Sequence, residues 1–189
     1  MLRELVLRNR SYRRFDEQVA ISRESLMELV DLARLSPSGG NQQALKFILS
    51  CDPVTNGRIF PSLAWAGYLK DWGGPTPGER PSAYIIILHD TSIRATAGVD
   101  PGIVAQTMAL AAVERGLGCC MIGAIQRNQL RREMEIPEQY EIALVLALGV
   151  PVETVVIDPL GADGDIKYWR DAQGVHHVPK RALDDIVIG

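Results

Sequence analysis

Residues 82–89 read Ser-Ala-Tyr-Ile-Ile-Ile-Leu-His, and this almost unbroken apolar run constrains the fold more than any other segment. A strand with apolar side chains on both faces must be covered on both faces, as in the centre of a sheet that lies between helices. Further strands are predicted at residues 46–51, 119–123 and 142–150, where short apolar runs lie between turn signals. The sequence therefore predicts a sheet with a fully buried centre.

The two longest predicted helices have clear start signals. The first begins at Ser22, its expected N-cap, and is expected to end near Leu35, because Pro37 disfavours helical geometry in the residue before it. The second covers residues 103–115 and follows the Asp-Pro pair at 100–101. This pair predicts an N-cap followed by proline at the first helical position. The second helix is rich in alanine and apolar almost all round, so we expect it to be buried.

The other segments are shorter or less regular. Helices are predicted near residues 2–6 and at 128–134. Residues 53–80 are interrupted by prolines and glycines, and we expect a loop beside a pocket with one short helix around 62–69. Beyond Pro151 the chain has too little apolar periodicity to fold alone and is expected to wrap over another surface. This order of elements predicts an α+β fold with three layers, in which helices flank a mixed sheet.

Length and charge limit the classes of protein to consider. The 189 residues suit one domain, residues 1–189, with 47% hydrophobic and 23% charged residues as in ordinary globular chains. A net charge of -3 gives no broad attraction for a polyanion, so no nucleic-acid partner is expected. The longest apolar run, residues 142–150, is far shorter than the roughly 20 residues that span a bilayer. No membrane partner is expected.

Cysteine and histidine usage points to a reducing compartment without a metal site. The three cysteines form no Cys-x-x-Cys pair, which argues against a disulfide framework and favours the cytoplasm. His176 and His177 beside Asp171 allow a metal site as an alternative, but adjacent histidines without a further spaced ligand rarely form one.

Two segments suit a planar, phosphorylated ligand. Residues 9–15 (Asn-Arg-Ser-Tyr-Arg-Arg-Phe) hold three guanidinium groups, which match phosphate oxygens, and residues 36–43 (Ser-Pro-Ser-Gly-Gly-Asn-Gln-Gln) form a turn with accessible backbone amides. Each segment has a plainer alternative: arginines on a solvated face paired with Asp16 and Glu17, and an ordinary helix stop. Neither a Gly-x-Gly-x-x-Gly turn between strand and helix nor a P-loop is present.

Four segments together resemble the flavin-dependent nitroreductase family, as a compact member. They are Arg-Ser-Tyr-Arg-Arg-Phe at 10–15, Pro-Ser-Gly-Gly-Asn-Gln-Gln at 37–43, Gly-Leu-Gly-Cys-Cys-Met-Ile-Gly at 116–123 and Lys-Arg-Ala-Leu-Asp-Asp-Ile at 180–186. Their order and spacing match the family over nearly the whole chain. Asn9 departs from the family's usual basic residue, and the Pro-Trp pair that often follows the glutamine is here Ala44-Leu45.

The resemblance implies a nitroreductase-like homodimer with FMN at the subunit interface and a C-terminal extension that wraps the partner subunit. Arg10 and Ser11 would meet the phosphate with Lys180 and Arg181, and Arg13 would meet the pyrimidine edge. Residues 37–39 would come from the partner. The implied cofactor-binding residues are Arg10, Ser11, Tyr12, Arg13, Pro37, Ser38, Gly39, Asn41, Gln43, Ile122, Gly123, Lys180 and Arg181.

The implied activity is an FMN-dependent oxidoreductase that passes electrons from NAD(P)H to a small electrophilic acceptor, a nitroaromatic or a quinone. The flavin carries the chemistry, so no side chain is nominated as an acid or base. Two alternatives share part of this pattern: a flavin carrier, sensor or flavin-modifying protein without turnover, and a colourless interaction module. Trp65, Tyr68, Lys70 and Trp72 are candidates for pocket lining, with ordinary packing as the alternative.

Overall fold

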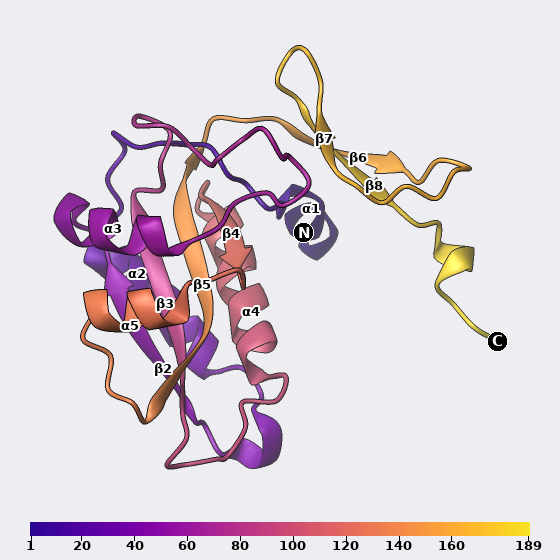
Figure 1. Cartoon of the computed structure of the whole chain (residues 1–189). Coiled ribbons are helices and arrows are strands. Elements are labelled where there is room, and N and C mark those ends of the chain that lie inside the picture. The colour runs from indigo at the N-terminus through magenta and orange to yellow at the C-terminus, as the bar shows by residue number, and fades with distance from the viewer.

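A five-stranded sheet forms the centre of the computed structural model, which describes residues 1–189 (Figure 1). Its strands are β1 (Phe15–Asp16), β2 (Leu45–Ser50), β3 (Ala83–Asp90), β4 (Gly118–Ile122) and β5 (Tyr140–Pro151), in the order β1-β5-β3-β2 with β4 paired to β5. Every ladder of this central sheet is antiparallel, so its strands do not form the mixed sheet that the sequence predicted. The segment before β1 adds one isolated parallel bridge, between Ser11 and Cys119. The predicted strands are confirmed, with their ends moved by one or two residues.

Helices cover both faces of this sheet, as the buried run predicted. Every residue of β3 is buried. Ile85 and Ile87 pack with α2 (Arg23–Arg34) and α4 (Asp100–Glu114). Tyr84, Ile86 and Leu88 join the opposite core with residues of α3 (Pro53–Ile59) and α5 (Arg127–Glu133). The three-layer α+β arrangement is therefore confirmed.

The predicted limits of α2 agree with its contacts. The Ser22 hydroxyl accepts a hydrogen bond from the Ser25 backbone N–H at 3.1 Å, and Leu35 is the C-cap. The short helices α1 (Leu2–Arg8) and α5 (Arg127–Glu133) also lie where the sequence predicted them. None of the helices has the length and apolar character needed to cross a membrane.

The predicted N-cap of α4 is wrong, although the helix itself is confirmed. The cap residue is Val99, and Asp100 is already inside the helix. The Asp100 side chain is only 4% exposed and its Oδ1 accepts from the Gly39 backbone N–H at 3.1 Å, with Arg94 at 3.7 Å. The Asp100 carboxylate therefore binds the backbone of Gly39, which is distant in sequence, instead of capping the first turn of its own helix.

The short helix predicted around residues 62–69 is also wrong. The helix in this region is α3 (Pro53–Ile59), continued by a 3-10 turn, Phe60–Ser62. Asp52 is its N-cap, because its Oδ1 accepts from the Thr55 backbone N–H at 2.8 Å. The remainder, residues 63–82, has no regular helix or strand, as a loop prediction expects.

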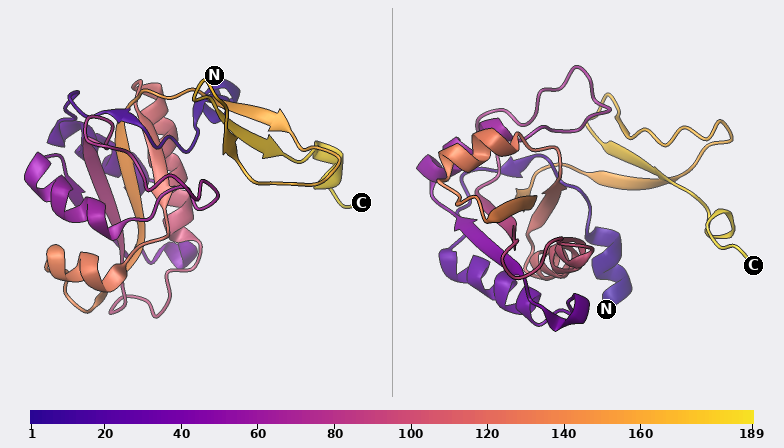
Figure 2. Two further views of the ribbon diagram at one scale, coloured as in Figure 1. Left: turned by 45° about the horizontal axis from the view of Figure 1, so that its top comes forward. Right: turned by 60° about the horizontal axis from the view of Figure 1, so that its bottom comes forward.

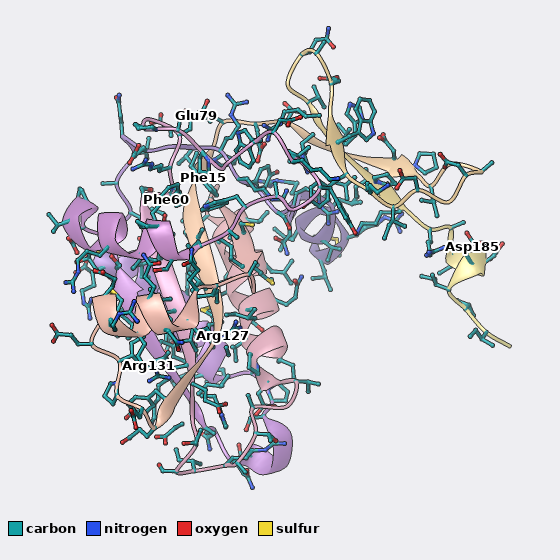
Figure 3. All side chains as sticks on the ribbon, in the orientation of Figure 1. Phe15, Phe60, Glu79, Arg127, Arg131 and Asp185 are labelled. Carbon is teal, nitrogen blue, oxygen red and sulfur yellow. The ribbon has the colours of Figure 1, made fainter.

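The last 38 residues, 152–189, form an arm that extends from one side of the body (Figures 1 and 2). In it β6 (Val155–Pro159) pairs parallel to β8 (His176–Lys180), and β7 (Trp169–Arg170) pairs antiparallel to β8. The sequence missed this small sheet. Asp185, in the 3-10 turn Leu183–Asp185, lies at the end far from the central sheet (Figure 3).

Candidate functional site

A hollow of about 340 Å³ lies where the chain after α1 meets the arm. We name it the arginine hollow. Its lining residues are Asn9, Arg10, Ser11, Arg13, Gln106, Cys119, Met121, Tyr168, His176, Val178 and Lys180. Four of the residues predicted from the sequence, Arg10, Ser11, Arg13 and Lys180, therefore come together from opposite ends of the chain.

Close packing against the sheet fixes the segment that carries these arginines. Ser11 forms a bridge with Cys119 of β4. Phe15 is completely buried against Gly149, where a Cβ atom would approach the Phe15 side chain to 2.7 Å. Tyr12 packs in the same way on Gly118. These glycines let the segment lie flat on β4 and β5, which aims its polar side chains at the hollow.

The Arg13 guanidinium is held by groups from two parts of the chain. Its Nη1 donates to the Ser11 carbonyl oxygen at 3.1 Å and lies 3.2 Å from Nε2 of His176. The guanidinium carbon also lies over the Tyr168 ring, 4.8 Å from its centroid. His176 and Tyr168 belong to the arm, so the arm completes the surroundings of Arg13.

The cations of the hollow have no acidic partner. Arg10 donates through Nη2 to the Val6 carbonyl oxygen at 2.8 Å, and its buried Nε has no partner. No carboxylate lies within ion-pair distance of Arg10, Arg13 or Lys180. Three unpaired cations beside a serine hydroxyl are a donor set that fits the phosphate of FMN.

The alternative of a solvated arginine face paired with Asp16 and Glu17 is wrong. Only Arg14 of the three has an acidic partner, and that partner is Glu79, whose Oε2 accepts from Arg14 Nε at 2.7 Å. This hydrogen-bonded pair raises the pKa of Arg14 and lowers the pKa of Glu79. Asp16 instead accepts from the Gln18 backbone N–H at 3.0 Å.

Glu153, at the base of the arm, holds the backbone of the arginine segment. Its side chain is fully buried. Its Oε1 accepts from the backbone N–H groups of Arg13 and Arg14, the latter at 3.2 Å, and its Oε2 accepts from Arg170 Nη2 at 3.0 Å. A buried carboxylate with three donors is satisfied, and it ties the arm to the site.

His176 is a neutral side chain in this setting. Burial, and then the charges of Arg13, Arg170 and His177, lower its pKa to about 4. A neutral imidazole can accept the Arg13 hydrogen bond at Nε2, which leaves its buried Nδ1 without a partner. The nearby thiols are inert, because burial raises the pKa of Cys119 to about 12 and that of Cys120 to about 11.

A second hollow of about 180 Å³ adjoins the first. We name it the loop hollow, lined by Arg13, Ala64, Trp65, Ala66, Gly67, Cys120, Met121, Ile122, Gly123, Ala124 and Tyr168. Arg13, Met121 and Tyr168 line both hollows. Ile122 and Gly123 thus lie next to the arginine hollow, and the loop of residues 63–80 lies beside a pocket as predicted.

Of the aromatic candidates in that loop, only Trp65 lines the hollow. The Tyr68 ring packs on Tyr168 with centroids 4.9 Å apart, and Trp72 lies under the Arg170 guanidinium at 4.7 Å. Both contacts attach the loop to the arm. Lys70 lines neither hollow.

The turn at residues 37–43 lies elsewhere in the same chain. Pro37, Ser38 and Gln43 line a separate hollow of about 210 Å³ that includes Asp100, at the start of α4. Arg8, just before the arginine segment, donates to the Val113 carbonyl oxygen at the end of α4, at 3.3 Å. The 13 positions from Asp100 to Val113 correspond to about 20 Å along a helix. One chain therefore does not bring the two predicted halves together.

Four other predicted residues line none of these hollows. Tyr12 donates its hydroxyl to the Arg8 carbonyl oxygen at 3.1 Å, and Arg181 is exposed beyond the end of β8. Gly39 donates to Asp100, and Asn41 is exposed in the left-handed region at φ 54°. Conversely, sequence reasoning missed Glu153, Tyr168 and His176 as parts of the site. Of these three, the sequence analysis considers only His176, as part of an alternative metal site.

The chain is similar to a known family of proteins over most of its length. Residues 6–150 match the model of the Nitroreductase family, which leaves the arm outside the match. A curated relative named putative NAD(P)H nitroreductase YodC, from Bacillus subtilis (strain 168), is 24% identical, with 76% of this chain and 86% of the relative covered.

Solved structures show the same fold. A nitroreductase family protein from Streptococcus pneumoniae TIGR4 is similar over 100% of both chains, with a TM-score of 0.73 at 14% identity. An FMN-dependent nitroreductase from Clostridium difficile R20291 is similar over 78% of this chain and 86% of that chain, with a TM-score of 0.62 at 22% identity. With the family model matched over most of its length, the chain belongs to the nitroreductase family.

Proposed function

We propose that this protein is an FMN-dependent oxidoreductase that takes a hydride from NAD(P)H and passes electrons to a small electrophilic acceptor, a nitroaromatic or a quinone. The observation that carries the proposal is the arginine hollow, where Arg10, Arg13 and Lys180 line one cavity without an acidic partner. The names of relatives, an NAD(P)H nitroreductase and an FMN-dependent nitroreductase, support the cofactor and the electron donor.

Different residues of the site would hold different parts of the cofactor. Arg10, Ser11 and Lys180 would hold the phosphate, and Arg181 and Tyr12 would support them from just outside the hollow. Arg13 stands between the arginine and loop hollows, so its charge would face the pyrimidine edge. When bound, FMN supplies the hydride-accepting chemistry. A fixed cation at that edge favours the negative charge that arrives there with the hydride.

The loop hollow is the proposed place of the ring and its acceptor. Main-chain groups of Ile122 and Gly123 would lie against the isoalloxazine, and Trp65 would limit the size of the acceptor. Cys120, the thiol of the loop hollow, is not nominated as an acid or base, since burial raises its pKa to about 11.

We further propose that the active form is a homodimer in which residues 37–39, with Asn41 and Gln43, reach the partner's arginine hollow. The separation of these residues from the arginine hollow of their own chain supports this. The arm would wrap the partner, because it extends from the body and exposes Leu183, Ile186 and Ile188. All three cysteines are free, which supports a cytoplasmic location.

The spectrum of the purified full-length protein tests this function. We expect flavin absorbance that bleaches when NADH or NADPH is added without oxygen and returns with a nitroaromatic or quinone. A spectrum that stays oxidised with both nicotinamides would favour a flavin carrier. Protein that remains colourless after mixing with excess FMN and desalting would overturn the proposal.

A further inference from the structure

The arm touches Arg13 at more points than chain connectivity requires. His176 and Tyr168 contact the guanidinium, and Glu153 accepts from the backbone N–H of the same residue. These three residues lie 140 or more positions after Arg13 in the sequence. The arm therefore fixes both the backbone and the side chain of one residue of the proposed cofactor site.

We propose that His176, with Tyr168 and Glu153, is a positioning residue that fixes the Arg13 guanidinium at the boundary between the arginine hollow and the loop hollow. The proposal rests on the proposed function, in which Arg13 faces the flavin. It adds that the cationic edge of the cofactor site is built by the arm of the same chain.

Glu153 fixes the backbone of Arg13. Glu153 accepts from two successive backbone N–H groups, those of Arg13 and Arg14, so the Cα of Arg13 has little freedom to shift along β5. Arg170 holds the other carboxylate oxygen at 3.0 Å, and its own guanidinium lies on Trp72. Glu153 thus links the arginine segment to Arg170 of the arm.

The side-chain contact then selects one direction for the guanidinium. An arginine has several rotatable bonds and a planar fork of five N–H donors, so an exposed one samples many directions. Here one donor is shared between the Ser11 carbonyl oxygen and His176 Nε2, and the Tyr168 ring covers one face. The Tyr168 ring is fixed in turn by Tyr68 and by His176, at 4.9 and 5.2 Å between centroids.

This contact requires an uncharged imidazole. A protonated His176 would present a donor and a positive charge to Arg13 at 3.2 Å, which is repulsive. The charged and titratable groups around His176 are Arg13, Arg170, His177, Lys180 and the Tyr168 hydroxyl, with Glu153 behind them. Most are cations, which agrees with its lowered pKa.

Ligand-free protein tests the contact itself, without reference to FMN. We expect the imidazole signals of His176, followed by NMR in full-length protein, to stay in the neutral form down to about pH 4. In the Arg13→Ala variant the titration should move to higher pH, because the adjacent cation is gone. An unchanged titration in that variant would overturn the proposal.

FMN affinity tests the consequence. His176→Leu removes the acceptor at similar volume, and we expect about tenfold weaker FMN binding to the ligand-free protein, the value of one hydrogen bond to a charged group. His176→Gln keeps an acceptor oxygen and should stay within about twofold of the wild type on the same basis. The matched control is His177→Leu, whose side chain contacts Asp158, Asp171 and Trp169 instead of Arg13.

The outcomes separate this proposal from the proposed function. If His176→Leu binds FMN like the wild type, or if His176→Gln or His177→Leu is as weak as His176→Leu, the positioning role is wrong. If the wild type itself binds no FMN, the proposed function fails, while the NMR titration still decides whether His176 holds Arg13.

Discussion

At the scale of single residues, unpaired charge is the distinctive property of this chain. Arg14 and Arg170 are neutralised by Glu79 and Glu153, whereas Arg10 and Arg13 have no acidic partner. Ion pairs at two of these arginines hold the framework, so the other two remain available for an anionic ligand. The sequence shows the three arginines of one segment but does not distinguish Arg14 from the other two, because its acidic partner, Glu79, lies 65 positions away.

We expect Arg13 to raise the reduction potential of the bound flavin. We predict that Arg13→Ala lowers the two-electron reduction potential by about 30 mV, the equivalent of roughly 1.5 kcal/mol for one charged contact. Spectroelectrochemical titration measures it. Arg3→Ala, which removes an exposed arginine of α1, is the control and should leave the potential unchanged. An equal potential in Arg13→Ala and Arg3→Ala would remove Arg13 from the flavin's edge.

We expect Glu153 to stabilise the fold as well as to position the backbone of Arg13. Glu153→Ala leaves two partly buried backbone N–H groups and the Arg170 guanidinium without their acceptor, so we predict a loss of about 3 kcal/mol in the free energy of unfolding. Urea titration measures it. Glu153→Gln keeps an acceptor oxygen and should lose clearly less. A loss below about 0.5 kcal/mol in Glu153→Ala, the size of an ordinary surface effect, would contradict this account.

The neutral His176 predicts a pH dependence of stability. Its pKa is lowered from the ordinary 6.5 to about 4, so between these values the unfolded chain binds more protons than the folded chain. Stability from this group is therefore present above pH 6.5 and is lost as the pH falls toward 4, by up to about 2 kcal/mol between pH 7 and pH 5. His177, with a raised pKa, acts in the opposite direction.

Unfolding midpoints at pH 7 and pH 5 check this, with His176→Gln as the comparison. The variant should lose less stability than the wild type over this interval, because glutamine does not titrate. The same pH dependence in both proteins would mean that His176 is protonated in the folded state at pH 5.

At the scale of elements, the sequence predicted those helices and strands that have strong local signals. The stripe of apolar residues that follows Ser22 was sufficient to predict α2, and the apolar run at 82–89 was sufficient to predict β3. The small sheet of the arm was missed because β6 and β8 each contain a proline and β7 has two residues, so no alternation is visible. Its contacts with Arg13, Trp72 and Tyr68 are tertiary and leave no local pattern.

Two Asp-Pro pairs show how tertiary contacts override a local signal. Asp52 caps α3, but Asp100 binds Gly39 and caps nothing. We predict that Asp52→Ala lowers the free energy of unfolding by about 1 kcal/mol, the usual value of an N-cap. Asp52→Ser, which can still cap, should recover most of it in the same urea titration. An Asp52→Ala variant as stable as the wild type would show that α3 does not depend on this cap.

At the scale of the whole molecule, the proposed homodimer would complete the site with residues of both chains. The family model matches the body, residues 6–150, in which the turn at 37–43 lines a separate hollow and not the arginine hollow. The sequence predicted four of the eleven residues that line the arginine hollow, three of which lie close together in one visible segment. It did not predict which residues of the arm meet them, since that depends on how β8 lies relative to β4 and β5.

The apolar end of the arm is expected to hold the dimer together. We predict that the wild type has the molar mass of a dimer, and that a Leu183→Ser, Ile186→Ser double variant dissociates at concentrations at least tenfold higher, since two apolar side chains of roughly 1.5 kcal/mol each are lost. Sedimentation equilibrium measures it. The control is Val54→Ser, an equally exposed apolar residue on α3. A monomeric wild type would contradict the shared site.

The most direct test of the central claim is the FMN dissociation constant of the Arg10→Ala, Lys180→Ala double variant beside that of the wild type. Cations from the two ends of the chain converge on one hollow, so their joint removal should weaken binding by roughly a hundredfold, the sum of two charge-assisted contacts. A double variant that binds FMN as tightly as the wild type would contradict the account.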